Sequence, residues 1–188
     1  MSSNRGRLIV ISGPTASGKS TLWRRLVTYP TVDFSVSVTT RSPRKNEVDG
    51  KDYQFLSREA FDALVDEDAF LEYATVHGRS YGTLRADVLK SIDAGQDILL
   101  EIDVQGQAQL RNCGLPLLSL FIVPPSLEVL RDRLRRRGTE SEEEMSRRLA
   151  IVEEEMKWAD DYDHVVVNDD LEEMIQKVIA LLGLEVKL

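Results

Sequence analysis

The feature that most constrains this chain is the stretch GPTASGKST, residues 13–21, which lies between an apolar segment and a segment with helical spacing. The apolar run at residues 8–11 predicts a strand, and the spacing of residues 22–27 predicts a helix. The stretch fits the pattern G-x-x-x-x-G-K-[ST], which forms a phosphate-binding loop when a strand precedes it and a helix follows it. We therefore expect this loop to hold a polyphosphate.

Each residue type in the loop has a predicted task. Glycines let backbone N–H groups turn inward around phosphates, and the following helix adds its unpaired N–H groups and the positive end of its dipole. Lys19 is expected to reach the β and γ phosphates, and the Ser20 hydroxyl to bind Mg²⁺. An ordinary glycine-rich turn is the alternative, but it leaves Lys19 without a structural task. The expected donor-binding residues are Gly13, Pro14, Thr15, Ala16, Ser17, Gly18, Lys19, Ser20 and Thr21.

Length and composition favour one α/β domain. The 188 residues suffice for one full core, and strand patterns alternating with helical patterns predict a doubly wound parallel sheet. No apolar run is long enough to cross a bilayer, and residues 1–7 lack the apolar centre of a signal peptide. The single cysteine, Cys113, is assigned no role. We expect a cytoplasmic protein, and its net charge of −8 argues against general nucleic-acid binding.

Further elements are predicted along the chain. Strands are expected at residues 34–38, 53–55, 70–73, 97–103, 117–123 and 164–168, with a glycine-punctuated turn at 77–83. Helix N-caps are expected at Ser57, Ser126, Ser141 and Asp170, and the helix after Ser141 is expected to run through Trp158.

Charged residues outside the loop have two interpretations each. Arg41 and Arg44 lie in a polar, proline-interrupted stretch, which indicates either a loop that faces an anion or a solvated basic turn. Glu72 stands between apolar residues on a predicted strand, so it lies either on a solvent face or in a pocket. Asp103 follows a predicted core strand, where ligands of parallel sheets bind and where exposed acids are also common.

The chain resembles the guanylate kinase family of P-loop nucleoside monophosphate kinases in eight segments: SGPTASGKST, SVSVTTRSPR, GKDYQF, FLEYATVHGRSYGT, LEIDVQG, FIVPPS, RRRGTE and VVVND. The resemblance covers nearly the whole chain in the family's order. It implies transfer of a phosphoryl group from ATP to GMP with Mg²⁺. It also implies a P-loop core at residues 7–37 and 84–188, a small mixed α/β insert for GMP at 38–83, and a helical lid at 138–145.

The resemblance implies a set of site residues. GMP would be held by Ser37, Arg41, Arg44, Tyr53, Glu72, Tyr81, Gly82 and Thr83, with Glu101 and Asp103 at the substrate edge and Asp103 also near the metal. Arg133, Arg137 and Arg148 would act with Lys19 on the transferred group, and Asn168 would contact adenine. Two residues depart from the family: many relatives have glycine where this chain has Ala16, and often histidine where it has Val38.

The chemistry of these side chains agrees with GMP as the acceptor. Guanine presents N1–H and a 2-amino group, which one carboxylate such as Glu72 can accept, while the hydroxyls of Ser37 and Thr83 can donate to O6. The arginines and tyrosine hydroxyls would fix the acceptor phosphate. Because the attacking oxygen is already ionised, no general base is required.

Three other functions remain open at this stage. A P-loop kinase of a phosphorylated sugar would have no use for a guanine reader. A non-catalytic, guanylate-kinase-like module that binds phosphopeptides typically loses the GKS loop that this chain keeps. The segment RDRLRRRG at residues 131–138 could bind nucleic acid, but the acids at 140–144 make it a poor electrostatic footprint. Phosphorylation of GMP, and also of dGMP, is favoured, and the oligomeric state stays open.

Overall fold

The structure is a computed structural model that describes residues 5–76, 78–137 and 142–185. Its internal contacts divide the chain into two compact units. The first unit comprises residues 1–9 and 31–117, and the second comprises residues 10–30 and 118–188. The predicted GMP-binding insert, 38–83, therefore belongs to the first unit and the phosphate-binding loop to the second.

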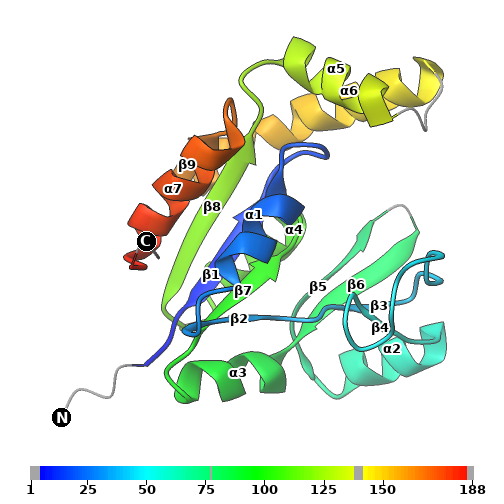
Figure 1. The fold of residues 1–188 in the computed structure, drawn as a ribbon. Helices are drawn as coiled ribbons and strands as arrows, with labels where there is room; N and C mark the ends of the chain where they lie inside the picture. The colour runs from blue at the N-terminus through cyan, green and yellow to red at the C-terminus, as the bar shows by residue number, and fades with distance from the viewer. Residues whose placement is uncertain (1–4, 77, 138–141, 186–188) are drawn as a thin grey trace. The chain divides into compact units, whose positions relative to one another are not determined.

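Strands and helices alternate over most of the chain (Figure 1). The strands are β1 (Leu8–Ser12), β2 (Val32–Phe34), β3 (Val38–Thr39), β4 (Gln54–Phe55), β5 (Phe70–Val76), β6 (Arg79–Leu84), β7 (Asp97–Glu101), β8 (Leu117–Val123) and β9 (His164–Val167). The helices are α1 (Lys19–Leu26), α2 (Arg58–Asp66), α3 (Arg85–Asp93), α4 (Val104–Leu110), α5 (Leu127–Arg137), α6 (Glu142–Met156) and α7 (Leu171–Leu182), with a short 3-10 helix at Ala159–Asp161.

The larger sheet has five strands in the order β2-β7-β1-β8-β9. Strand β2 pairs with β7, and β8 with β9, in parallel. All of β1 is buried, as is the second half of β8, which is typical of strands covered on both faces. The prediction of an α/β fold around a parallel sheet is confirmed. Within the described ranges, no helix combines the length and the apolar character needed to cross a bilayer.

The smaller sheet lies in the first unit and has the order β4-β3-β6-β5. Strand β3 is parallel to β4 and antiparallel to β6, and β5 and β6 form an antiparallel pair. Helix α2 runs alongside this sheet in Figure 1 and contributes Phe61 to a buried cluster with Val38 and Phe70. Val38, one of the two family departures, is thus fully buried in this cluster and has a packing role.

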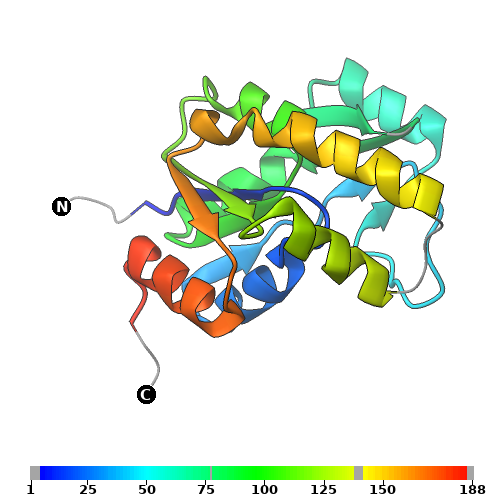
Figure 2. The same ribbon diagram turned by 90° about the horizontal axis from the view of Figure 1, so that it is seen from above.

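The second unit contains α1, α5, α6 and α7. Helices α5 and α6 lie side by side in Figure 2 and enclose a buried apolar cluster. Helix α7 buries an apolar stripe of five residues: Met174, Ile175, Val178, Ile179 and Leu182.

Three of the predicted N-caps are confirmed. In each case the side-chain oxygen accepts from the backbone N–H three residues later, at 3.0–3.2 Å, as N-caps do. These residues are Ser57, Ser126 and Asp170. The predicted N-cap Ser141 lies outside the described residues, and α6 ends at Met156, before Trp158.

Three predicted strand or turn boundaries are wrong. The alternating segment 34–38 is not one strand, because β2 ends at residue 34 in one sheet and β3 begins at residue 38 in the other. Most of the predicted turn 77–83 is strand β6, since pairing with β5 and β3 on both edges overrides its turn-like composition. The predicted strand 97–103 ends at Glu101, because Asp103 caps α4 instead of continuing the strand.

Candidate functional site

The phosphate-binding loop requires glycine at two positions. Gly13 has φ 135° and Gly18 has φ 99°, values that side-chain-bearing residues rarely adopt. A Cβ atom would also collide with the Ile122 carbonyl oxygen at the first position and with Asn168 Nδ2 at the second. The loop backbone is therefore packed closely against the ends of β8 and β9.

Lys19 is bonded within the loop itself. Its Nζ donates to the carbonyl oxygen of Gly13 at 2.6 Å and to that of Pro14 at 2.9 Å. The expectation that Lys19 has no structural task is therefore wrong, because its ammonium ties the start of α1 to the start of the loop. Ser20 and Thr21 are exposed in the first turn of α1, which contains no acidic residue and so favours an anion.

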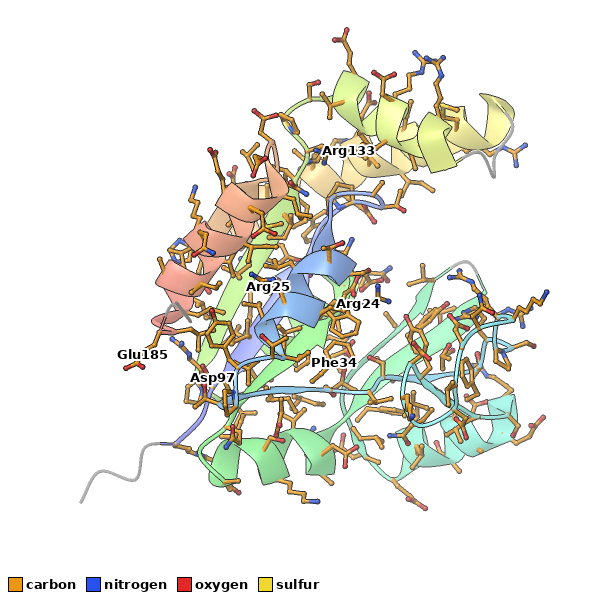
Figure 3. All side chains as sticks on the ribbon, in the orientation of Figure 1. Arg24, Arg25, Phe34, Asp97, Arg133 and Glu185 are labelled. Atoms are coloured by element: carbon orange, nitrogen blue, oxygen red, sulfur yellow. The ribbon has the colours of Figure 1, made fainter. Side chains whose placement is uncertain are left out.

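Asn168 connects three segments of the second unit. Its side-chain Nδ2 donates to the Ser17 carbonyl oxygen at 2.7 Å, and its backbone N–H donates to Val123 at 2.8 Å. Its carbonyl oxygen accepts from Nη2 of Arg133, which Figure 3 labels, at 2.9 Å. Asn168 is 4% exposed, so it supports the loop, whereas the implied adenine contact stays a prediction.

Ala16 has a left-handed backbone, with φ 60°. This conformation disfavours any residue with a Cβ atom, which explains why a glycine would fit here. The partly buried Ala16 packs against the apolar cluster between α5 and α6 that contains Leu130, Leu134, Met145 and Val152. Alanine at this position therefore has an unfavourable backbone conformation, which is offset by a contact between the loop and these helices.

The predicted lid, residues 138–145, lies partly outside the described residues. Residues 138–141 lie outside the described part of the chain, and so do the side chains of Arg137 and Arg148. The roles implied for these two arginines stay predictions. Arg133, the third arginine predicted to act on the transferred group, has a described side chain on α5, which is half-buried and bonded to Asn168.

In the first unit, Arg41 is held by an acid and by aromatic rings. Its Nη1 and Nη2 donate to both carboxylate oxygens of Glu47, at 2.9 and 2.8 Å, and each side chain is 15% exposed. The guanidinium lies 5.3 Å from the Tyr53 ring centre and 5.8 Å from that of Phe55. Hydrogen bonding within the pair raises the pKa of Arg41 and lowers the pKa of Glu47.

This cluster brings together three of the residues predicted to hold the acceptor phosphate: Arg41, Tyr53 and Tyr81. The two tyrosine rings meet edge to face with centres 6.0 Å apart. Burial, and then the negative charge of Glu101, raise the pKa of Tyr53, so its hydroxyl keeps its proton and can donate. Arg44 is different, because its side chain is 78% exposed and lies 3.9 Å from the Glu47 carboxylate.

Glu47 is a residue that sequence reasoning missed. Its carboxylate also accepts from the Arg44 backbone N–H at 2.7 Å, so it fixes both the side chain and the turn of the basic loop. No local pattern predicts this, because Glu47 lies six residues after Arg41 in irregular structure.

A β-bulge turns Glu72 away from the apolar face of the smaller sheet. Phe70 pairs with Leu84 and Glu72 pairs with Thr83, so one residue of β5 is extra at Leu71. Paired residues point to the same face, and neighbours in a strand point to opposite faces. Phe70 therefore joins the cluster under α2, whereas Glu72 and Thr83 share the other face.

The Glu72 carboxyl is buried and bonded. It is 4% exposed, and its Oε1 accepts from Thr83 Oγ1 at 2.6 Å. Burial, reinforced by the charge of Asp103, raises the pKa of Glu72 to about 7 against an ordinary 4.5, although the Thr83 bond opposes the shift. Of the two interpretations of Glu72, the solvent face is excluded because the side chain is buried, and its place in a ligand pocket stays a prediction.

The other residues predicted to hold GMP have different environments in the first unit. Ser37 is half-buried just before β3, and Glu101 ends β7 close enough to act on Tyr53. Gly82 has a packing role, because the Phe70 ring occupies the space that a Cβ atom at position 82 would fill.

Asp103 is the N-cap of α4, and its Oδ1 accepts from the Gly106 N–H at 2.9 Å. Among the residues that the structure describes, no group of three His, Cys, Asp or Glu side chains could hold a metal ion.

Comparison with known proteins agrees across nearly the whole chain. A family model described as guanylate kinase matches residues 5–184. A guanylate kinase of Caldanaerobacter subterraneus is 44% identical over 95% of this chain and 87% of its own length. One of Thermus thermophilus is 44% identical over 98% of this chain and 83% of its own. The crystal structure of a guanylate kinase from Anaplasma phagocytophilum superposes with a TM-score of 0.77 at 36% identity, over 95% of this chain and 85% of that one.

Proposed function

The chain belongs to the guanylate kinase family, and from that premise we propose that it transfers the γ-phosphoryl group of ATP to GMP through the residues described above. The observation that carries the proposal is the buried Glu72 carboxyl beside Thr83 in the first unit, in a chain whose second unit has an intact phosphate-binding loop. The sugar-phosphate kinase and the non-catalytic module explain only one of these two features each.

The base is read by Glu72 in this proposal. Its carboxylate accepts from N1–H and from the 2-amino group of guanine, and Thr83 can turn its hydroxyl from Glu72 to the base. Adenine would present an acceptor to the same carboxylate, leaving a buried charged group unpaired, so AMP is rejected by roughly 10⁴-fold. A 2′-deoxyribose changes none of these contacts, and we propose dGMP as a second acceptor.

The acceptor phosphate is held by the cluster around Arg41. Glu47 and the aromatic rings hold the guanidinium in place before the substrate arrives, so little side-chain freedom is lost on binding. The hydroxyls of Tyr53 and Tyr81 donate to the same phosphate, and the exposed Arg44 adds charge at the rim. The attacking oxygen is ionised, so positioning and charge neutralisation supply the catalysis.

The donor is held by the backbone of residues 13–18 and by Lys19. When ATP binds, the Lys19 ammonium exchanges the carbonyl oxygens of Gly13 and Pro14 for phosphate oxygens. Arg133, Arg137 and Arg148 neutralise charge on the transferred group, an effect that is stronger in the transition state than in the ground state.

Mg²⁺ fits the oxygen donors available. This ion usually keeps several waters and binds one or two protein oxygens together with substrate phosphates, so it needs no cluster of three carboxylates. We propose that the exposed Ser20 hydroxyl would be one such ligand and the Asp103 oxygen that does not cap α4 would be another. When bound, the ion supplies neutralisation of the β and γ phosphates.

One coupled assay tests the proposal. ADP formation from ATP is followed with GMP, dGMP, AMP, UMP and no acceptor, in the presence and absence of Mg²⁺. We expect turnover with GMP and dGMP only, and only with Mg²⁺. Turnover with AMP or UMP at a rate comparable to GMP would contradict the role of Glu72, and absence of any turnover would favour the phosphopeptide-binding alternative.

A further inference from the structure

A glutamine of α4 holds this helix against strand β5. Gln109 Oε1 accepts from the Tyr73 backbone N–H at 3.2 Å, and Gln109 Nε2 donates to the Tyr73 carbonyl oxygen at 2.7 Å. Strand β5 lies at the edge of the smaller sheet, so this side-chain amide pairs with backbone groups that a further strand would otherwise bind. The double hydrogen bond fixes the helix at the residue next to Glu72.

Gly106 lies one turn earlier on the same face of α4 and leaves room for the Glu72 carboxyl. A Cβ atom on Gly106 would collide with Glu72 Oε2 and would lie 3.1 Å from Glu72 Cδ. The backbone of Gly106 is not left-handed, and glycine is a weaker helix former than alanine. Conformational freedom therefore does not explain this glycine, whereas the space taken by the carboxyl does.

The start of α4 is fixed as well. Asp103 caps the helix by accepting from the Gly106 N–H at 2.9 Å, so the residue that faces Glu72 is itself bonded to the cap. The helix is thus held at Asp103 and at Gln109, with Gly106 between them against the carboxyl. The seven-residue helix α4 therefore positions one side chain of strand β5, that of Glu72.

We propose that Gly106 and Gln109 set the base specificity of this enzyme as positioning residues, by holding α4 so that the Glu72 carboxyl faces the base edge with both of its oxygens. The inference rests on the proposed function, because it assumes that Glu72 reads guanine. A methyl group at position 106 displaces the carboxyl, and loss of the Gln109 amide lets the helix drift from β5. Either change weakens the contact with the 2-amino group of guanine.

The test compares GMP with inosine monophosphate, which has the same N1–H and O6 but lacks the 2-amino group. We measure kcat/KM for both acceptors at saturating ATP in wild type, Gly106→Ala and Gln109→Ala. Gln105→Ala is the matched control, because Gln105 lies exposed on the same helix. We expect the ratio of GMP to inosine monophosphate to fall roughly tenfold in Gly106→Ala and a few-fold in Gln109→Ala. The control ratio and all KM values for ATP stay at wild type.

A double variant separates positioning from general damage. Once Glu72→Ala has removed the carboxyl, adding Gly106→Ala should change the ratio no further. An unchanged ratio in both single variants, or an equal fall in the Glu72→Ala background, would overturn the inference. If Gly106→Ala fails to fold, the Gln109→Ala ratio decides alone. Wild type without GMP turnover would refute the proposed function itself, whereas wild-type turnover with unchanged ratios refutes only this inference.

Discussion

The phosphate-binding loop and the proposed base site, Glu72 with Thr83 and Gly106, are both suited to a polar ligand but are built from different parts of the chain. The loop uses backbone groups and one lysine from residues 13–21, and its glycines with positive φ lie within a few residues of the groups they position. The base site uses side chains from β5, β6 and α4, which are separated by up to 34 residues between Glu72 and Gly106. The residues proposed to bind phosphate are thus neighbours in the sequence, whereas those proposed to read the base are brought together by tertiary packing.

The two sites also differ in how their polar groups are satisfied. In the loop, Lys19 bonds to two carbonyl oxygens, and these bonds can be exchanged for phosphate oxygens at little net change. In the base site, Glu72 is buried with one hydroxyl partner and a raised pKa, so its carboxylate gains most when a ligand supplies further donors. Mutations in the loop should therefore affect the rate, and mutations in the base site should affect selectivity.

The largest effect is expected from Lys19→Met. Removing the ammonium removes a strong electrostatic stabiliser of the transferred group, so kcat falls by about 10²-fold or more. Because Lys19 also bonds within the loop, the melting temperature falls by a few degrees as well. Steady-state kinetics and thermal melts measure both quantities.

Lys90→Met, on the exposed face of α3, is the matched control and should leave both values at wild type. A Lys19→Met enzyme with nearly intact kcat would mean that the lysine serves only the loop structure. That result would contradict the inference that the loop sets the rate while the base site sets selectivity.

The second prediction concerns Glu72→Gln, which keeps the shape of the side chain and offers one acceptor in place of two. We expect kcat/KM for GMP to fall by roughly 10- to 100-fold, the range for losing a hydrogen bond to a charged group, while the KM for ATP changes little. An equal loss for both nucleotides would indicate a folding defect. No loss for either would show that another residue reads the base.

These two predictions mark what the sequence could and could not reveal. The loop, its flanking strand and helix, and the caps at Ser57, Ser126 and Asp170 are all local, and periodicity and spacing predicted them. The prediction of one strand at 34–38 is wrong because the two ends of this segment pair in different sheets. Local sequence carries no information about which sheet a strand joins.

The sequence alone does not decide whether the Glu72 side chain lies in a pocket or on a solvent face. The bulge that decides this question is a property of the pairing between β5 and β6. Glu47 and Gln109 were missed for the same reason, since each acts on a segment that only the folded chain brings near it. The resemblance to a family predicts residues that contact ligands, but it includes neither Glu47 nor Gln109.

The third prediction is that the KM for GMP depends on pH through the Glu72 carboxyl. Guanine needs the ionised Glu72, whose pKa in the empty enzyme is about 7, so the KM for GMP should rise about tenfold from pH 8 to pH 6. The phosphate of GMP also titrates in this range, and Glu72→Gln, measured over the same series, isolates that contribution. A wild-type profile identical to that of the variant would show that Glu72 does not titrate there.

The same shift has a consequence for stability, with the opposite sign to that of a salt-bridged acid. The folded protein keeps the Glu72 proton up to about pH 7, whereas an unfolded chain loses it near 4.5. The contribution of Glu72 to the free energy of unfolding therefore falls as the pH rises between these values. Denaturant melts of wild type and Glu72→Gln at pH 5 and pH 8 should diverge accordingly.

The smallest effect is expected from Ala16→Gly, which tests how far the loop depends on anything beyond its own backbone. Glycine removes the left-handed strain of about 1–2 kcal/mol but gives the unfolded chain about 0.5–1 kcal/mol of extra freedom. It also removes the methyl contact with the cluster between α5 and α6. These terms nearly cancel, so the melting temperature should stay within about 2 °C of wild type. Ala16→Val provides the contrast, because a β-branched residue tolerates positive φ worst and should lower the melting temperature by several degrees. If Ala16→Gly instead lost several degrees, the contact with α5 and α6 would outweigh the strain, and the loop would depend on tertiary packing as the base site does.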